Sequence, residues 1–276
     1  MTIQTALVQG TSLLEESHVP SPRLTAEVLL SYALRCERIF LYSHSDDELT
    51  QVAWLHYGRY LHQRMQGKPT QYITKRQEFY GRDFRVTPAV LIPRPETELV
   101  VEHAIKVIPP RGRVVDVGCG SGAIATTLAL ETSAEVYATD ISTDALLVAR
   151  ENACRLGARV RFATMDLLGS FRSLSLDAVV SNPPYVAHAE ADGLQREVRD
   201  HEPHVALFAG PNGTELYERI VEDAQRVLKP GGVLVLELGW KSLQAVQAML
   251  QAPWTDHAIT DDLAGIPRAI SARWAP

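Results

Sequence analysis

The stretch VVDVGCGSGAIA (114–125) joins an apolar, β-branched run to a helix-forming segment through three glycines. Gly118, Gly120 and Gly122 permit a tight turn, and they let a ligand approach the backbone beside the N–H groups that begin the helix. A dinucleotide-binding turn would read G-x-G-x-x-G, whereas the spacing here is G-x-G-x-G. The stretch predicts a ligand-binding turn in an α/β fold, and a glycine-rich turn without a ligand is the structural alternative.

From residue 113 onward, apolar β-branched runs alternate with helical patterns. The expected strands are 113–118, 135–140, 159–166, 177–182 and 232–239, and the clearest expected helices are 143–157 and 215–228. This alternation predicts a mostly parallel sheet with helices on both faces. Two further strand-like pieces, 257–263 and 268–274, are too close for a crossover helix and should form an antiparallel edge pair.

A helical part and a hairpin precede the α/β pattern. Apolar residues recur at helical spacing in 24–34 and in 52–65, whereas 77–92 shows short alternating segments around Gly81. Pro95 suits a first helical position, so another helix should begin there. We predict a helical domain over 1–75, a β-hairpin linker over 76–92 and an α/β domain over 93–276.

Composition is ordinary for a globular protein: of 276 residues, 46% are hydrophobic and 22% charged. No apolar run approaches the roughly 20 residues of a membrane helix, and MTIQTALVQG lacks the pattern of a signal peptide. Cys36, Cys119 and Cys154 show no C-x-x-C spacing, which argues against a disulfide framework and a zinc site. A cytoplasmic protein without a membrane partner is expected.

Charge is unevenly distributed along the chain. The net charge is −6, and residues 1–85 contribute +1 from ten basic and nine acidic side chains, which leaves −7 for the remainder. A protein that binds duplex phosphates usually has a stronger basic face. A protein partner or a small ligand therefore fits better than stable binding to nucleic acid.

Acidic residues end the next two expected strands. Asp140 stands where a carboxylate can accept hydrogen bonds from both ribose hydroxyls of a nucleoside. It could instead cap the helix 143–157, although Ser142 or Thr143 could also do that. Asp166 stands opposite the expected place of an adenine, with a turn residue as the alternative.

SNPPYV (181–186) follows the fourth expected strand with two prolines, which cannot donate ladder hydrogen bonds. It lies beside the first strand, at the carboxyl end where open α/β sheets bind ligands. Together, D-x-G-x-G-S-G and the acid at 140 resemble the Rossmann-like fold of S-adenosylmethionine (SAM) methyltransferases. N-P-P-Y resembles the members that methylate glutamine amides, adenine N6 or guanine N2.

The residue types in this turn suit such chemistry. An amide or aryl amine nitrogen is a poor nucleophile, so its lone pair must be held toward the methyl carbon. The Asn182 side-chain oxygen and the Pro183 carbonyl could accept its two N–H groups, Tyr185 could pack on the flat group, and Pro184 keeps the turn rigid. Since a sulfonium is an activated donor, no metal or nucleophile is required, and water could take the proton.

Nearly the whole chain is similar to the peptide chain release factor glutamine N5-methyltransferases, the PrmC/HemK family. The resemblance rests on LIPRPETELVVE (91–102), PTQYI (69–73), EFYG (78–81), EPHVALFAG (202–210), KPGGVLVLELGW (229–240) and AGIPRAISAR (264–273). Relatives that act on a ribosomal-protein glutamine share N-P-P-Y, so PRPETE is the discriminating stretch.

The resemblance implies transfer of a methyl group from SAM to the glutamine of the Gly-Gly-Gln loop of class 1 release factors, with S-adenosylhomocysteine as product. It implies a substrate-docking helical domain, a hairpin and a SAM-dependent methyltransferase domain. By position, it implies SAM contacts from Asp116, Gly118, Cys119, Gly120, Ser121, Gly122, Asp140, Ile141 and Asn182, adenine contacts from Asp166 and Leu167, and glutamine contacts from Asn182, Pro183, Pro184 and Tyr185.

Arg94, Glu96 and Glu98 could orient the partner or close over SAM, but roles at the helix start or in surface ion pairs remain open. Lys75 replaces a usual glycine, FAGPNG (208–213) replaces a more glycine-rich run, and Leu167 is aliphatic where some members are aromatic. These departures concern the docking of the partner rather than the reaction.

Two rival functions remain. Amino methylation of nucleic acid would also suit N-P-P-Y, but the acidic balance after residue 85 counts against it. A non-catalytic SAM-fold scaffold would tolerate loss of Asn182 or of a loop glycine, and all are present.

Two other clusters receive structural readings. His201 and His204 are separated by Pro203, which disrupts the helix that would align them on a metal. Trp54, Tyr57 and Tyr60 are expected in the core of the helical part rather than in a base-stacking platform.

Overall fold

The computed structural model describes residues 1–276 and divides into two compact units. The first comprises Met1–Arg76 together with Gln195–His201, and the second comprises Gln77–Leu194 and Glu202–Pro276. A short segment of the later chain therefore packs with the N-terminal helices.

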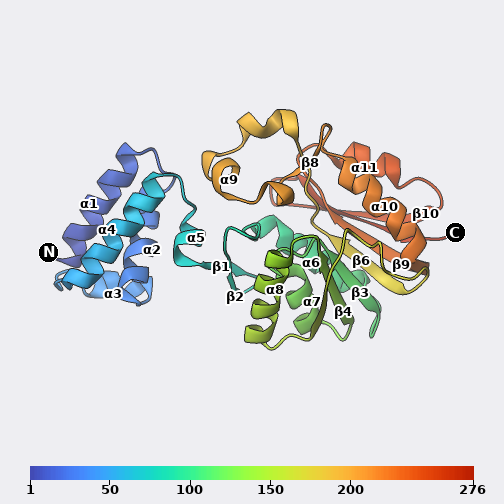
Figure 1. Cartoon of the computed structure of the whole chain (residues 1–276), viewed down its shortest axis with the longest axis horizontal. Helices are drawn as coiled ribbons and strands as arrows, with labels where there is room; N and C mark the ends of the chain where they lie inside the picture. The colour runs from blue at the N-terminus through green and yellow to red at the C-terminus, as the bar shows by residue number, and fades with distance from the viewer. The chain divides into compact units, whose positions relative to one another are not determined.

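The first unit is helical, and its helices α1 to α4 form a small bundle (Figure 1). Its helices are α1 (Ile3–Glu16), α2 (Pro22–Leu34), α3 (Arg38–Ser43), α4 (Gln51–Met65), α5 (Thr70–Thr74) and α9 (Arg196–His201). The side-chain oxygens of Thr2 and Thr50 cap α1 and α4 by accepting from backbone N–H groups. Tyr57 is wholly buried and Trp54 and Tyr60 pack against the same core, so the predicted core role of these aromatics is confirmed.

Helix α9 is tied to this bundle by charge. The guanidinium of Arg64 forms an ion pair with the Glu197 carboxylate at 2.6 Å, and the Arg64 side chain is only 7% exposed. Arg64 also donates a hydrogen bond to the Lys68 carbonyl at 3.3 Å. A buried guanidinium needs such partners, because a buried charge without them is costly.

A hairpin of β1 (Arg76–Phe79) and β2 (Arg82–Arg85) lies within the segment 76–92, for which a hairpin linker was predicted. Tyr80 and Gly81 connect the strands with φ values of 52° and 68°, as a two-residue hairpin turn requires. Phe79 and Phe84 from the two strands lie in the core of the second unit, edge to face at 5.9 Å. The hairpin is therefore part of the packing of that unit.

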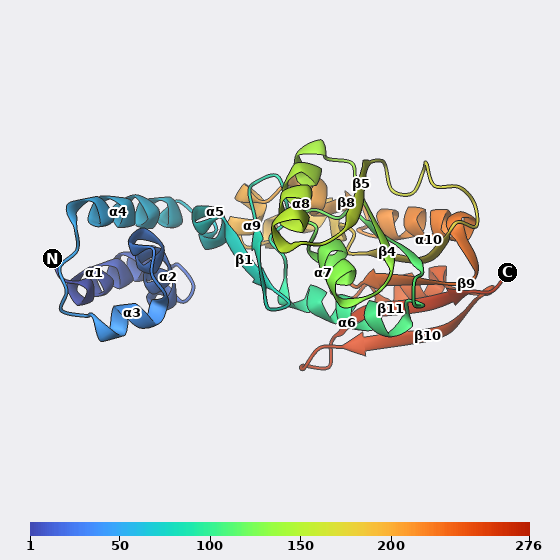
Figure 2. The ribbon, with the colours of Figure 1, turned by 90° about the horizontal axis from the view of Figure 1, so that it is seen from below.

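The second unit is built on a seven-stranded sheet of order β10-β11-β9-β6-β3-β4-β5. Its strands are β3 (Arg113–Val117), β4 (Glu135–Asp140), β5 (Val160–Thr164), β6 (Leu176–Ser181), β9 (Leu228–Glu237), β10 (Trp254–Asp261) and β11 (Pro267–Trp274). The strands β3, β4, β5, β6 and β9 are parallel to one another. Next to β9, the strands β11 and β10 complete the sheet in antiparallel pairing, as Figure 2 shows. The predicted mostly parallel sheet with an antiparallel edge pair is confirmed.

Helices cover both faces of this sheet (Figures 1 and 2). They are α6 (Pro95–Val107), α7 (Ala123–Glu131) and α8 (Thr143–Leu156) on one face, and α10 (Glu215–Val227) and α11 (Leu243–Met249) on the other. Along β3, Val114 packs into the core beneath α6, α7 and α8, whereas Val115 and Val117 pack into the core beneath α10 and α11. Strands covered on both faces are apolar throughout, which explains the continuous hydrophobic runs.

Small irregularities separate the observed strands from the expected ones. β9 begins at Leu228, earlier than predicted, because the KPGG segment forms a bulge with Gly231 at φ 81°. The short pieces β7 (Val186–Ala187), η1 (His188–Gly193), η2 (His204–Ala206) and β8 (Phe208–Gly210) follow the N-P-P-Y turn. No helix of the protein combines the length and the apolarity that crossing a membrane requires.

Candidate functional site

The glycine turn between β3 and α7 is open on one side. Gly118 and Gly120 have φ values of 70° and 52°, and a Cβ added at either would meet no atom within 4 Å. A Cβ at Gly122 would lie 2.9 Å from the Cβ of Ala149, so this glycine permits close approach to α8 instead. The turn thus leaves room for a ligand above its first two glycines.

Asp116 lies directly behind this turn and is 1% exposed. Its Oδ2 accepts a hydrogen bond from the Ala125 N–H at 2.9 Å, while its Oδ1 has no partner. Burial raises the pKa of Asp116 to about 7, and the charge of Asp140 adds to this effect. A carboxylate in this position favours a cationic group nearby.

Asp140 ends β4 and connects it to the glycine turn. One carboxylate oxygen accepts from the Gly120 N–H and the other from the Ser142 N–H, both at 2.8 Å. Burial raises the pKa of Asp140, against the effect of these N–H donors. Ser142 caps α8 by accepting from the Ala145 N–H, so Asp140 is not the cap. Ile141, next to it, is 58% exposed.

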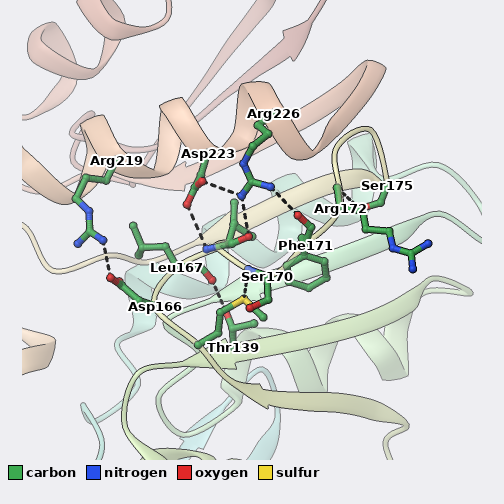
Figure 3. Close-up of polar contacts among 12 residues, drawn as sticks. Thr139, Asp166, Leu167, Ser170, Phe171, Arg172, Ser175, Arg219, Asp223 and Arg226 are labelled. Atoms are coloured by element: carbon green, nitrogen blue, oxygen red, sulfur yellow. Dashed lines mark hydrogen bonds and ion pairs between the residues drawn. The ribbon is translucent and has the colours of Figure 1, made fainter.

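The loop after β5 carries Asp166 and Leu167 (Figure 3). Asp166 lies two residues beyond the end of β5 and pairs with Arg219 at 2.7 Å, with both side chains more than half exposed. Leu167 adopts a φ of 49°, and its carbonyl accepts from the Thr139 hydroxyl at 3.2 Å. The backbone of this loop is therefore fixed against β4, while the Asp166 carboxylate stays accessible.

Helix α10 holds the rest of this loop (Figure 3). Arg226 donates to the carbonyls of Leu168 and Phe171 and also pairs with Asp223. Asp223 in turn accepts from the Leu168 N–H at 3.4 Å. These contacts attach the segment that follows Asp166 to a helix of the adjacent layer.

The N-P-P-Y turn begins where β6 ends, between β3 and β9. The Ser181 hydroxyl donates to the Val117 carbonyl at 2.7 Å, which ties the start of this turn to the start of the glycine turn. Asn182 is half-buried, and its Nδ2 donates to the Thr97 hydroxyl at 3.2 Å. Pro183 is buried and Pro184 is half-buried.

Tyr185 packs against the turn after β9. A Cβ added at Gly239 would lie 2.6 Å from the Tyr185 ring, so only glycine leaves the ring in its place. Burial raises the pKa of Tyr185 to about 12, with a contribution from the charge of Glu237. The ring therefore stays neutral in the physiological range.

The strand register brings these pieces together. Val117 of β3 pairs with Ser181 of β6, and Ser181 pairs with Leu236 of β9. The next residues along the three strands are Gly118, Asn182 and Glu237. Because neighbouring strands are about 4.8 Å apart, the glycine turn, the N-P-P-Y turn and a buried carboxylate lie side by side at one edge of the sheet.

Two further buried polar residues at this site, Thr97 and Glu237, were not predicted from the sequence. Thr97 is 4% exposed on α6, and Glu237 is 2% exposed with its Oε2 unpartnered. Burial raises the pKa of Glu237 to about 7, against a hydrogen bond from the Thr97 hydroxyl. An acidic residue at the end of the apolar strand beside β6 was the available signal.

Arg94 and Glu98 have partners within the second unit. Arg94 pairs with Glu202, a 4% exposed residue whose other oxygen accepts from the Ile92 N–H. Glu98 accepts from the Tyr80 N–H at 2.8 Å and so holds the hairpin turn. These contacts support the structural reading of both residues, and a contact with a protein substrate stays a prediction.

Two remaining features bear on the chemistry. No group of three or more His, Cys, Asp or Glu side chains is arranged to hold a metal ion. Burial keeps the pKa of the Cys119 thiol well above its usual range, so this cysteine is protonated rather than a thiolate nucleophile.

Comparison with known proteins places the chain in a family. The model of the PrmC N-terminal domain matches residues 5–74, and that of the methyltransferase small domain matches residues 95–199. The release factor glutamine methyltransferase of Koribacter versatilis (strain Ellin345) is 44% identical over 277 residues, which cover 99% of each chain. The chain belongs to the release factor glutamine methyltransferase family. This membership confirms the family predicted from the sequence.

Other members of the release factor glutamine methyltransferase family are similarly close. The protein of Moorella thermoacetica (strain ATCC 39073 / JCM 9320) is 43% identical and covers 99% of this chain and 98% of its own. Among solved structures, a methyltransferase from Pyrococcus furiosus superposes with a TM-score of 0.55 at 18% identity, over 75% of this chain and 94% of its own. That likeness confirms the methyltransferase fold.

Proposed function

We propose that this protein transfers a methyl group from SAM to the side-chain amide nitrogen (N5) of the glutamine in the Gly-Gly-Gln motif of class 1 release factors. One observation carries the proposal: in a chain of this family, the rigid N-P-P-Y turn and the open glycine turn follow paired residues of adjacent strands. Such a substrate places the reaction in the cytoplasm, in translation termination.

The residues around the glycine turn fit SAM. Open space above Gly118 and Gly120 admits a ligand to the backbone, and the unpartnered Oδ1 of Asp116 suits a ligand that carries positive charge. Asp140 has lone pairs left for ribose hydroxyls beyond its two backbone contacts. The cofactor-binding set would be Asp116, Gly118, Cys119, Gly120, Ser121, Gly122, Asp140, Ile141 and Asn182.

Asp166 and Leu167 would flank the adenine. The Asp166–Arg219 pair is exposed on both sides. Exposed pairs contribute only about 0–1 kcal/mol, so Asp166 can turn toward a ligand amine at little cost. The backbone of Leu167 is already held by Thr139 and would not need to move.

The N-P-P-Y turn would hold the glutamine amide. SAM, when bound, supplies a methyl group on an activated sulfonium, so the protein has only to orient the acceptor nitrogen. Because Nδ2 of Asn182 is directed at Thr97, its Oδ1 is left for one amide N–H, and the Pro183 carbonyl suits the other. Pro184 stiffens the turn, and Tyr185 would pack on the flat amide. The nitrogen gains the methyl group and gives up one proton to water.

We assign docking of the release factor to the helical domain at 1–75, which the hairpin at 76–92 connects along the chain to the methyltransferase domain at 93–276. The helical domain exposes several large apolar side chains: Ile39 at 74%, Tyr42 at 55%, Val52 at 64% and Leu55 at 64%. Surface apolar groups of this kind support protein binding. Arg94 and Glu98 are the candidate contacts from the methyltransferase domain.

The deciding experiment is incubation of the protein with SAM and a class 1 release factor, followed by mass spectrometry of the Gly-Gly-Gln peptide. We expect one methyl group on that glutamine and S-adenosylhomocysteine in equal amount. Asn182→Ala should abolish turnover while SAM binding is largely retained. If SAM binds to the wild-type protein and the glutamine stays unmodified, the substrate assignment is wrong.

The same assay separates the rival functions. Methylation of a ribosomal-protein glutamine, or of adenine or guanine in nucleic acid, in place of the release factor would replace the proposed substrate. Survival of cellular function in the Asn182→Ala variant would favour a non-catalytic scaffold.

A further inference from the structure

Thr97 connects two buried polar groups of the site. Its Oγ1 accepts from Nδ2 of Asn182 at 3.2 Å, and its hydroxyl, acting as a hydrogen-bond donor, lowers the pKa of the buried Glu237 carboxylate. Thr97 and Glu237 are 4% and 2% exposed, so water does not compete for these contacts. The three side chains come from α6, the end of β9 and the turn after β6.

The single proton of the Thr97 hydroxyl determines how Asn182 is turned. When that proton is given to an ionised Glu237, Oγ1 offers only lone pairs to Asn182. The Asn182 amide must then present its NH₂ group to Thr97, and its Oδ1 is directed away from Thr97. An asparagine in the opposite orientation would offer N–H groups where the substrate also offers N–H groups.

We propose that Thr97 and Glu237 are positioning residues that set the amide orientation of Asn182, so that Oδ1 accepts from the substrate amide. The proposal rests on the proposed function for its catalytic consequence, whereas the orientation itself is a property of the protein alone. Neither residue is assigned contact with SAM or with the glutamine.

The orientation depends on the ionisation of Glu237. A protonated Glu237 can donate to Oγ1 of Thr97, which frees the Thr97 proton to point at Asn182 and reverses the amide. Burial raises the pKa of Glu237 to about 7, so this change falls near neutral pH. The charged and titratable groups that act on Glu237 or feel its charge are Glu96, Arg94, Arg268, Tyr185 and Tyr217.

Neighbouring charges change the pKa of Glu237 in opposite directions. Glu96 raises its pKa, while Arg268 and Arg94 lower it. Arg94 is paired with Glu202 and Arg268 with Asp262, so neither guanidinium is an exclusive partner. The unpartnered Oε2 shows that the carboxylate is not neutralised by a direct ion pair.

The first test compares Thr97→Val with Thr97→Ser in the full-length protein. Valine keeps the shape and removes the hydroxyl, whereas serine keeps the hydroxyl. We expect Thr97→Val to lower kcat by roughly 10-fold or more, the effect of one lost hydrogen bond on the choice between two orientations, with the Kd for SAM unchanged. Thr97→Ser should restore most of the rate, and equal rates for the valine variant and the wild type would overturn the proposal.

The second test is the pH profile of Glu237→Gln. In the wild type, kcat should rise with pH through about 7. A glutamine oxygen still accepts from Thr97 and does not titrate, so the variant should keep activity at pH 8 and lose this rise. Saturating SAM is needed, because Asp116 titrates in the same range and would act on SAM affinity. An unchanged rise in the variant would overturn the assignment to Glu237.

A third measurement is independent of the substrate. The chain contains only three asparagines, at 152, 182 and 212, so ¹⁵N-asparagine labelling gives three side-chain amide pairs. We expect the Asn182 pair to shift with a midpoint near pH 7 in the wild type and to stay constant in Glu237→Gln. If this shift is seen but the release factor is not methylated, the proposed function is wrong while the roles of Thr97 and Glu237 in orienting Asn182 still hold. If the shift is absent, the proposed roles of Thr97 and Glu237 are wrong.

Discussion

Gly239→Ala is the sharpest steric probe of the N-P-P-Y turn. The added Cβ would lie 2.6 Å from Cδ2 and 2.7 Å from Cγ of Tyr185, and 3.0 Å from Oγ of Ser242. Gly239 lies outside the left-handed region, so alanine meets no backbone strain of its own. Carbon atoms in ordinary contact are about 3.5–4.0 Å apart, so the Tyr185 ring must move by about 1 Å.

Two effects of this shift can be separated. Overpacking of a filled site costs about 1–3 kcal/mol of stability, which a thermal or urea melt would detect. A displacement of about 1 Å at a group that positions the substrate can lower the rate about 100-fold. We therefore expect kcat for the release factor to fall strongly while the Kd for SAM changes little, because the glycine turn is not touched.

Gly58→Ala is the matched control. Gly58 is an exposed residue inside α4, and a Cβ there would meet nothing within 4 Å. The same substitution should raise stability by about 0.5–1 kcal/mol, without an effect on kcat. If Gly239→Ala keeps the wild-type kcat and melting temperature, then Gly239 does not set the position of the Tyr185 ring and the steric reasoning is refuted.

Three further predictions concern ionisation, ion pairing and docking. The folded-state pKa of Asp116 is raised from 3.8 to about 7, so between these values the folded protein keeps a proton that the unfolded chain loses, and its stability falls as pH rises. Asp116→Asn should therefore gain stability relative to wild type between about pH 4 and 7 in urea melts. A difference in unfolding free energy between variant and wild type that stays constant over this range would contradict the prediction. Arg94→Ala leaves the buried Glu202 without its ion-pair partner and should lower the free energy of unfolding by about 1–3 kcal/mol, a range reduced because Arg94 is 31% exposed. Adding Glu202→Gln to Arg94→Ala should recover part of this stability, and no recovery would show that the unpaired charge is not the cause. The double variant Ile39→Ser, Val52→Ser should raise the KM for the intact release factor without changing the melting temperature. Val8→Ser, which replaces an exposed apolar residue of α1, is the control and should change neither quantity. A wild-type KM in the double variant would show that the helical domain does not dock the release factor.

The sheet could be predicted from sequence because its central parallel strands β3, β6 and β9 are covered on both faces and therefore contain long apolar runs. The Gly-rich turn was equally legible, since its three glycines stand between such a run and a helix. The start of β9 was not, because the bulge at Gly231 extends the pairing through a K-P-G-G segment that resembles a turn. Local pattern reports periodicity, and a bulge interrupts periodicity without ending the strand.

Contacts between distant segments were also beyond the sequence. Nothing in residues 195–201 indicates that Glu197 pairs with the buried Arg64, since the two are far apart in the chain. Likewise, Asp166 was predicted to end the third strand but lies two residues beyond the end of β5, and its partner Arg219 comes from helix α10, later in the chain. Charged side chains pair with whichever opposite charge lies nearby in the folded structure, and a single sequence does not show which charges lie near one another.

Thr97 and Glu237 illustrate the same limit at the site itself. The sequence shows an acid at the end of an apolar strand and a threonine inside PRPETE, but only the register of β3, β6 and β9 shows that Glu237 lies in one row with Gly118 and Asn182. A slip of one residue in β6 would turn Asn182 to the opposite face of the sheet and remove it from Thr97. The Ser181–Val117 hydrogen bond opposes that slip at the last pair of the ladder.

The spacing between the proposed methyl donor and its acceptor is therefore set by a sheet rather than by loops. Adjacent strand ends about 4.8 Å apart hold the two turns, and positions fixed on strands are more precise than positions on loops. An amide nitrogen reacts only from a narrow range of orientations, so a rigid turn beside a rigid turn suits the reaction better than two mobile ones. Flexibility would raise the entropy lost on reaching the reactive geometry, and the prolines at 183 and 184 reduce that loss before the substrate arrives.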